Sequence, residues 1–153
     1  MARGTQEEVR IAVLNGPNLN LLGTREPAIY GRTTLPEIEA RLQDVARELR
    51  VEVECAQHNG EGELIDAIQA LRGRADAAII NAGAYSHTSL AIRDAFASVE
   101  VPFVEVHLTN IFAREPERRH STLAPGAKAV LCGFGAAGYE LALRGLAATL
   151  SAK

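Results

Sequence analysis

Hydrophobic positions along the chain follow two patterns, short apolar runs and helical repeats, which alternate along the sequence. Short apolar runs bounded by polar or turn-forming residues predict buried strands over residues 9–14, 76–80, 103–107 and 128–132. Residues 51–55 alternate between apolar and charged side chains, which is typical of a half-exposed strand at a sheet edge. Apolar residues at helical spacing predict helices over 35–49, 63–71, 88–99 and 139–150.

Strands that alternate with helices in a short chain predict a parallel sheet with helices on both faces. We expect an α/β, flavodoxin-like three-layer fold with a five-stranded sheet in the order 2-1-3-4-5, because this order places strand 51–55 at an edge. In such folds ligands bind beyond the carboxyl ends of the strands, where the connections after the first and third strands diverge. The polar residues that follow those strands are therefore the first candidates for a site.

Length and composition predict one globular domain over residues 1–153. The chain has 16 basic and 19 acidic residues, a net charge of -3, and 47% hydrophobic but only 5% aromatic residues. A mildly acidic chain with few aromatic side chains lacks the basic stripe and the stacking surfaces typical of nucleic-acid binding. We therefore expect a small-molecule partner and no nucleic acid.

No segment of the sequence predicts a membrane association. The residues before the first strand lack an apolar stretch, so we expect no signal peptide. The apolar run 130–150 contains Glu140 and Arg144, whose i, i+4 spacing predicts a surface ion pair on a helix rather than a membrane span. Cys55 and Cys132 stand far apart and form no pattern typical of a disulfide framework. These features favour a cytoplasmic protein.

Polar residues cluster after three of the predicted strands. They are Asn15 and Asn18 after the first, Asn81, Ser86, His87 and Thr88 after the third, and His107, Thr109 and Asn110 after the fourth. The sequence Asn-Gly-Pro-Asn at 15–18, taken alone, would equally be an ordinary turn. Three clusters at one edge of a sheet favour a binding or catalytic site.

Two further segments add candidate chemistry. Residues 19–33 form a long segment that we expect to lack secondary structure and to act as a lid or binding loop, with Arg25 and Tyr30 in it. Residues 114–120 contain three arginines. This run is either a solvated surface or, because guanidinium groups bind carboxylates in bidentate fashion, a clamp for an acidic substrate.

Several cofactor motifs are absent or stand in the wrong context. Residues 133–138 spell G-x-G-x-x-G, but no strand follows to supply a ribose-binding acid, so close helix packing is the better interpretation. The four histidines show no metal-ligand spacing, and there is no phosphate-binding lysine motif. The only lysines are Lys128 and Lys153, which leaves no plausible nucleophile for a Schiff base. We expect no metal and no cofactor.

The motifs of this chain resemble those of the type II 3-dehydroquinate dehydratases. The resemblance covers almost the whole sequence and rests on residues 15–23, 25–27, 30–31, 57–59, 61–62, 81–83, 87–89, 105–107 and 114–115. It implies a flavodoxin-like subunit, a homododecamer built as a tetramer of trimers, and a cofactor-free conversion of 3-dehydroquinate to 3-dehydroshikimate.

The resemblance also implies catalytic roles. Tyr30 would be the base that removes the C2 proton, with Arg25 beside it to stabilise the phenolate. His107 would be the general acid at the departing C1 hydroxyl, and Glu105 would orient its ring. Asn18 would hold a water at the enolate oxygen. A free phenol is almost wholly protonated at neutral pH, and one arginine about 4 Å from the tyrosine is sufficient in principle to ionise it.

The remaining implied positions bind substrate. They are Asn81, His87, Arg118, the backbone amides of Leu108 and Thr109, the lid-side Arg114, and Asp94, which would reach the site of a neighbouring subunit. The family commonly has Ser at position 109 and Thr at position 86, and either keeps a hydroxyl. The same reaction in quinate catabolism, an FMN- or phosphate-binding module, and a catalytically silent oligomeric scaffold remain as alternatives.

Overall fold

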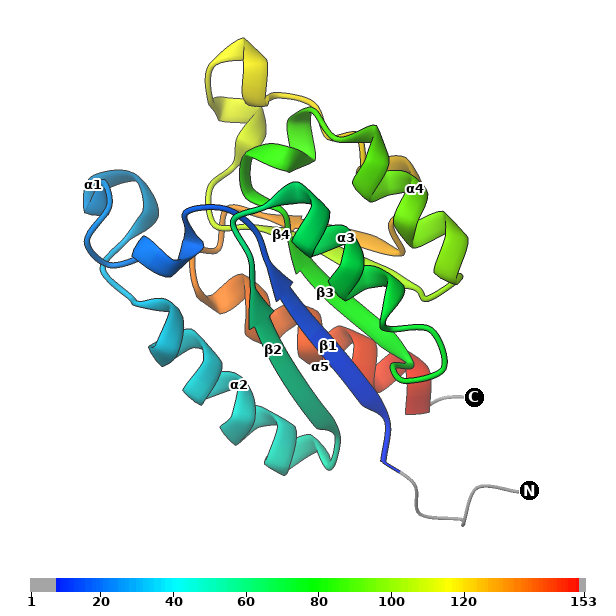
Figure 1. Ribbon diagram of the computed structural model, residues 1–153. Coiled ribbons are helices and arrows are strands. Elements are labelled where there is room, and N and C mark those ends of the chain that lie inside the picture. The colour runs from blue at the N-terminus through cyan, green and yellow to red at the C-terminus, as the bar shows by residue number, and fades with distance from the viewer. Residues whose placement is uncertain (1–7, 152–153) are drawn as a thin grey trace.

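A computed structural model describes residues 8–151, which form a parallel sheet between two layers of helices (Figure 1). The strands are β1 (Arg10–Asn15), β2 (Glu52–Gln57), β3 (Ala77–Asn81), β4 (Phe103–His107) and β5 (Ala129–Cys132). All neighbouring strands pair in parallel, in the order β2-β1-β3-β4-β5, so the predicted fold and strand order are confirmed. The alternating strand β2 lies at an edge, as its sequence pattern predicted.

Two helices cover each face of the sheet. The longer helices are α2 (Leu35–Leu49), α3 (Glu61–Gln69), α4 (Leu90–Val99) and α5 (Ala137–Ser151). α2 and α5 pack together on one face, and α3 and α4 on the other. Successive side chains of a strand point to opposite faces, so the central strands β1 and β3 supply both hydrophobic cores. Because both faces of β1 and β3 are buried, most residues of these two strands are apolar.

Capping residues begin the helices close to the predicted positions. Thr34 and Glu37 form a capping box at α2: the Thr34 hydroxyl accepts from the Glu37 amide, and the Glu37 carboxylate accepts from the Thr34 amide, both at 3.3 Å. Ser89 caps α4 through the Ile92 amide at 3.0 Å, so the helix starts at Leu90 rather than at residue 88. α3 begins two residues before its predicted start, because acidic residues rather than apolar ones fill its first turn.

Residues 19–33 contain helical turns, which corrects the expectation of a segment without secondary structure. The 3-10 turn η1 spans Leu19–Leu21, and the short helix α1 spans Pro27–Tyr30. Pro27 occupies the first turn of α1, where its missing amide hydrogen costs nothing. A four-residue helix is too short to show an apolar repeat, which is why periodicity did not predict it. Further 3-10 turns are η2 (Gly83–His87), η3 (Ile111–Ala113), η4 (Pro116–Arg118) and η5 (Ala124–Gly126).

The glycine-rich segment 133–138 packs a helix closely against the sheet, as its context predicted. Gly133 and Gly135 have positive φ angles of 97° and 60° in the turn before α5. A Cβ atom at Gly138 would lie 3.4 Å from Val106 Cγ1, so α5 passes close to β4 at this residue. The expected pair between Glu140 and Arg144 forms on α5, with 3.1 Å between the charged atoms. Among residues 8–151, no helix is long and apolar enough to span a membrane.

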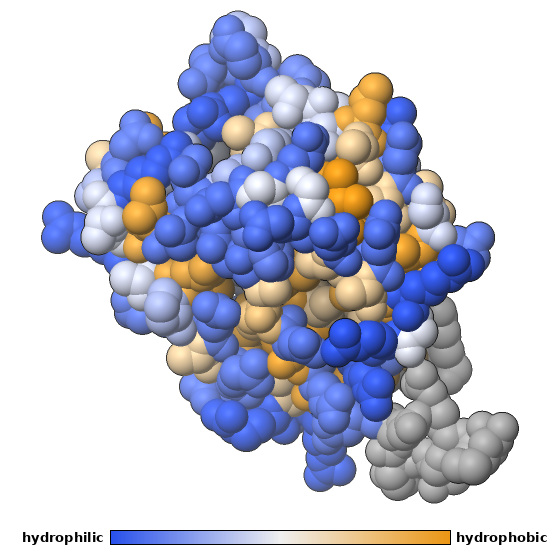
Figure 2. Space-filling model, viewed as in Figure 1, coloured by the Kyte–Doolittle hydropathy of each residue, from blue (hydrophilic) through white to orange (hydrophobic). Residues whose placement is uncertain are grey.

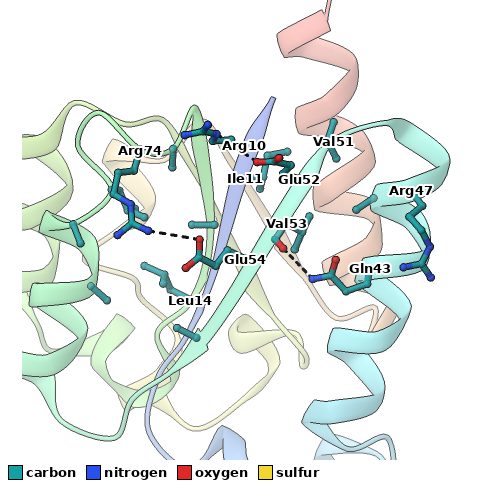
Figure 3. A pocket seen from close by; sticks show the side chains of 17 residues that line it. Arg10, Ile11, Leu14, Gln43, Arg47, Val51, Glu52, Val53, Glu54 and Arg74 are labelled. Atoms are coloured by element: carbon teal, nitrogen blue, oxygen red, sulfur yellow. Dashed lines mark hydrogen bonds and ion pairs between the residues drawn. The ribbon is translucent and has the colours of Figure 1, made fainter. Parts of the chain in front are cut away.

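A large cavity lies over the edge of the sheet, away from the polar strand ends. Its volume is about 510 Å³, and its floor is made by small and apolar side chains of β1 and β2 between α2 and α3. Figure 2 shows this region as a pale and orange hollow below the centre of the view. Charged side chains stand around it, and Arg74 pairs with Glu54 at 3.9 Å (Figure 3). The Gln43 side chain also donates a hydrogen bond to the Val53 carbonyl at this cavity (Figure 3).

Candidate active site

A second, smaller cavity lies where the predicted polar clusters meet. Its volume is about 130 Å³. Asn81 and His107 are the last residues of β3 and β4, so the parallel sheet brings them to one edge. The lining includes these predicted residues: Asn18, Arg25, Tyr30, Asn81, His87, His107, Leu108, Thr109, Arg114 and Arg118. Convergent polar groups, rather than size, make this cavity the candidate active site.

Two predicted residues do not line the cavity. Glu105 is fully buried on β4, two residues before His107, and therefore points to the same face of the strand. Asp94 is exposed on α4 and makes no contact with the cavity wall. Within the described part of the chain, the site therefore assembles without Asp94.

Glu105 and His107 form a buried hydrogen-bonded pair. The Nε2–H of His107 donates to Oε2 of Glu105. The carboxylate also accepts from the Ser121 hydroxyl, which lies 2.8 Å from Oε1 and 2.7 Å from Oε2. The hydrogen bond to the buried carboxylate fixes the orientation of the ring. The arrangement suits an imidazole that gives up a proton from its other nitrogen.

His87 stands next to His107 with a fixed tautomer. The two rings are stacked, with 6.0 Å between centroids. Nδ1–H of His87 donates to the His120 carbonyl at 2.7 Å, and Nε2–H of His120 donates back to the His87 carbonyl at 2.8 Å. Burial lowers the pKa of His87, and this effect, together with the nearby His107, Arg118 and His120 side chains, outweighs the hydrogen bond to the His120 carbonyl, which raises it. His87 is therefore neutral at pH 7 and offers Nε2 as a hydrogen-bond acceptor.

Two arginines flank Tyr30. Arg114 Nη2 donates to the Tyr30 hydroxyl at 3.3 Å, and Arg114 Nη1 donates to the Thr109 hydroxyl at the same distance. Arg25 lies over the face of the tyrosine ring, with its Cζ 4.8 Å from the centroid. The resemblance assigns the counter-charge to Arg25, but in this geometry Arg114 contacts the oxygen that would carry the negative charge. Both guanidinium groups therefore contact the Tyr30 side chain, one at its oxygen and one over its ring.

Close backbone packing shapes the loop that carries Asn18. A Cβ atom at Gly16 would lie 2.5 Å from the Ala82 carbonyl oxygen, so only glycine allows the two strand ends to approach this closely. Asn18 itself adopts a left-handed conformation, with φ of 70°. Its amide donates to the Asn59 side-chain oxygen at 3.0 Å, and the Gln57 side chain donates to the Gly16 carbonyl at 3.0 Å.

A buried chain of hydrogen bonds orients Asn81. The Asn81 Nδ2 donates to the Tyr139 hydroxyl at 2.9 Å, and that hydroxyl donates to Asn15 Oδ1. The Gly83 amide donates to Asn81 Oδ1 at 3.1 Å. Tyr139 is completely buried, and this burial raises the pKa of its hydroxyl, which keeps it a neutral donor. Asn81 therefore presents its amide to the cavity in one orientation.

The arginines make the cavity basic within an acidic chain. Arg25, Arg114 and Arg118 line it, and each has an acidic neighbour on the outer side. Glu115 serves two of them, at 3.4 Å from Arg114 and 3.3 Å from Arg118. Arg119 instead donates to the Arg114 carbonyl at 2.6 Å and does not line the cavity. The arginine-rich segment 114–120 is therefore partly a binding site and partly a solvated surface. Arg114 and Arg118 line the cavity, and Arg119 is exposed on the surface.

The structure adds residues that the sequence did not assign to the site. Ser121 and His120 contact Glu105 and His87, and Tyr139 contacts Asn81. The sequence predicts Tyr139 only as a core residue, because it lies in the apolar repeat of α5. Nothing in that repeat indicates that its hydroxyl contacts Asn81. Among residues 8–151, no group of three or more His, Cys, Asp or Glu side chains is placed to hold a metal ion.

Comparisons with known proteins show the family of this chain. The family model described as Dehydroquinase class II matches residues 9–147. The chain is 59% identical over 143 residues to a 3-dehydroquinate dehydratase from Gemmatimonas aurantiaca, and the match covers 94% of each protein.

Solved structures of two type II dehydroquinases are also similar. The enzyme from Propionibacterium acnes has a TM-score of 0.87 at 42% identity, covering 93% of this chain and 99% of that one. The protein from Butyrivibrio crossotus has a TM-score of 0.89 at 41% identity, covering 91% and 97%. Because the family model and these relatives span nearly the whole sequence, the chain belongs to the class II dehydroquinase family.

Proposed function

We propose that this protein dehydrates 3-dehydroquinate to 3-dehydroshikimate by an anti elimination through an enolate. The observation that carries the proposal is that one cavity is lined by a tyrosine hydroxyl bound to an arginine and by an imidazole paired with a buried carboxylate. Removing a proton next to a ketone and protonating a departing hydroxyl require a base and an acid of this kind.

Tyr30 acts as the base. Its phenolate takes the proton from C2 of the substrate, and the electron pair of that C–H bond moves into the enolate. Arg114 at the hydroxyl and Arg25 over the ring stabilise the phenolate before it reacts. Asn18 holds a water that donates to the enolate oxygen as negative charge develops there.

His107 acts as the acid. The enolate expels the C1 hydroxyl, which leaves as water after it receives the proton from the His107 imidazolium. Glu105 stabilises that imidazolium and keeps Nε2 engaged, so Nδ1 is the nitrogen that donates. After the reaction Tyr30 holds one proton more and His107 one fewer, and proton exchange with solvent restores both groups.

The remaining cavity residues bind the substrate. The amides of Leu108 and Thr109, with Arg118, bind the carboxylate, and Arg114 closes over it from the lid side. Asn81 and the neutral His87 hydrogen-bond the ring hydroxyls. In this proposal Asp94 completes the site of a neighbouring subunit in a homododecamer, which agrees with its exposed position on α4.

The proposed enzyme works in the cytoplasm, in the shikimate pathway of aromatic amino acid biosynthesis. The mechanism is non-covalent, since Lys128 is exposed at the start of β5, at the opposite end of the sheet from the cavity. Lys153 lies outside the described residues.

Adding 3-dehydroquinate to the purified protein tests the proposal. The conjugated enone of the product absorbs in the ultraviolet, so its appearance should follow enzyme concentration linearly. A protein that binds 3-dehydroquinate without forming the enone would contradict the proposed activity.

A further inference from the structure

Two adjacent residues outside the cavity wall, His120 and Ser121, position the two histidines that line it. His120 contacts His87 directly, and Ser121 contacts the carboxylate that pairs with His107. His120 exchanges two hydrogen bonds with His87, one through its carbonyl and one through its ring. The next residue, Ser121, contacts Glu105 behind His107. Neither residue lines the cavity, so both act through the histidines. The contact of Ser121 is the more informative because it reaches the carboxylate that pairs with His107, the proposed acid.

The Ser121 hydroxyl must be the donor in its hydrogen bond with Glu105. The amides of Leu123 and Ala124 both donate to Ser121 Oγ, each at 3.1 Å. A hydroxyl oxygen accepts two hydrogen bonds and donates one, so these amides occupy both lone pairs. Its single hydrogen is left for the carboxylate, whose oxygens lie 2.7 and 2.8 Å away.

This donation fixes the position of the Glu105 carboxylate. Glu105 is fully buried and receives hydrogen bonds from Ser121 on one side and from His107 on the other. A carboxylate held by two donors cannot rotate away from the ring. The position of Glu105 in turn determines which nitrogen of His107 faces the substrate.

We propose that Ser121 is a positioning residue for the dehydration: by donating to Glu105 it holds the carboxylate that orients the His107 ring. The inference rests on the proposed role of His107 as the acid. The competing explanation is that Ser121 only shapes the chain around η5, because its oxygen also accepts the two amides. A test must separate donation to Glu105 from support of this segment.

The adjacent Thr122 supplies a matched control. Its hydroxyl donates to the carbonyls of Ser86 and Ser89, at 3.1 and 3.2 Å, and so anchors the same segment without touching Glu105. Thr122→Val keeps the shape of the side chain and removes only these bonds. Ser121→Ala removes the donor to Glu105, and Ser121→Thr retains a hydroxyl.

Steady-state kinetics should separate the variants. We expect Ser121→Ala to lower kcat about tenfold with KM changed less than about twofold, because it disturbs the acid rather than substrate binding. Ser121→Thr should restore kcat to within about twofold of the wild type, and Thr122→Val should leave kcat within the same range. If Ser121→Ala does not fold, Ser121→Cys, whose thiol is a weak donor, replaces it in the comparison.

Nuclear magnetic resonance on protein with 15N-labelled histidine gives a readout that does not depend on activity. The Nε2–H of His107, held against a carboxylate, should give a far-downfield proton signal that Ser121→Ala shifts or broadens and Thr122→Val does not. If the wild type lacks dehydratase activity, the proposed function fails, but this signal still tests the role of Ser121. Wild-type kcat and an unchanged signal in Ser121→Ala, or equal effects in Thr122→Val, would overturn the inference.

Discussion

The Arg114 guanidinium donates a hydrogen bond to the Tyr30 hydroxyl at 3.3 Å, across 84 residues of sequence. Arg25, five residues before Tyr30, lies over the ring with its Cζ 4.8 Å from the centroid, compared with 5.4 Å for the Arg114 Cζ, and has no hydrogen bond to the hydroxyl among those found in residues 8–151. A cation at the oxygen stabilises the charge of a phenolate more than one over the ring, because the charge is concentrated on the oxygen. The geometry therefore ranks Arg114 above Arg25 as the counter-charge of the proposed base.

Neutralising the two arginines separately should reveal this ranking in the pH dependence of turnover. Arg114→Gln should move the ascending limb of the kcat profile to higher pH, because the phenolate loses its contacting cation. Arg25→Gln should move it less. Turnover measured from about pH 5 to 10 checks both variants, with Arg25→Lys as the control that keeps a cation. A limb that moves only in Arg25→Gln would contradict the ranking.

Much of the fold follows from the sequence because its signals are local and repeated. The apolar runs at 76–80 and 103–107 and the capping box at Thr34 each depend on a few neighbouring residues, and the structure confirms them. The helix Pro27–Tyr30 has no such repeat, and its boundaries depend on how the segment packs near the cavity.

The site residues at strand ends were also predictable, since a parallel sheet gathers those ends at one edge. Which arginine contacts Tyr30 was not predictable, because the contact joins α1 to the segment after η3. The hydroxyls of Ser121 and Tyr139 were missed for the same reason. Their partners Glu105 and Asn81 lie 16 and 58 residues away, and no sequence pattern indicates that pairing.

The lowered pKa of His87 predicts a pH-dependent stability. Because burial holds its folded-state pKa below the ordinary value of 6.5, the unfolded chain binds a proton first as pH falls. His87 therefore costs no stability above about pH 6.5 and destabilises the fold progressively below it. Urea unfolding of the wild type and His87→Gln between about pH 5 and 8 should show a shallower decline in the variant.

His58→Gln, on the loop after β2 and outside the cavity, controls for the removal of an imidazole. Parallel declines in the wild type and His87→Gln would mean that His87 does not titrate differently in the two states.

Tyr139→Phe should destabilise the fold. The substitution leaves Asn15 Oδ1 and Asn81 Nδ2 without their buried partner, at a cost of about 1 to 3 kcal/mol. Tyr85→Phe is the matched control, because the Tyr85 hydroxyl donates to the Asn59 carbonyl at 2.7 Å in an exposed setting. We expect it to lose less stability, and equal losses in urea unfolding would argue against the buried network.

Borohydride tests the non-covalent mechanism. A Schiff base needs a lysine amine at the substrate ketone. Lys128 is exposed just before β5, at the end of that strand away from the cavity. Activity should therefore survive treatment with borohydride in the presence of 3-dehydroquinate, and mass spectrometry should find no adduct. Inactivation with a stable adduct on the chain would refute this mechanism.

The central claim is that Tyr30 removes the proton from the substrate, and Tyr30→Phe tests it most directly. The variant keeps the ring that packs against Arg25 but lacks the oxygen that Arg114 contacts. Enone formation from 3-dehydroquinate should fall by about 100-fold or more, while the protein still folds and binds substrate. Near-normal turnover in Tyr30→Phe would contradict the account and remove Tyr30 from the chemistry.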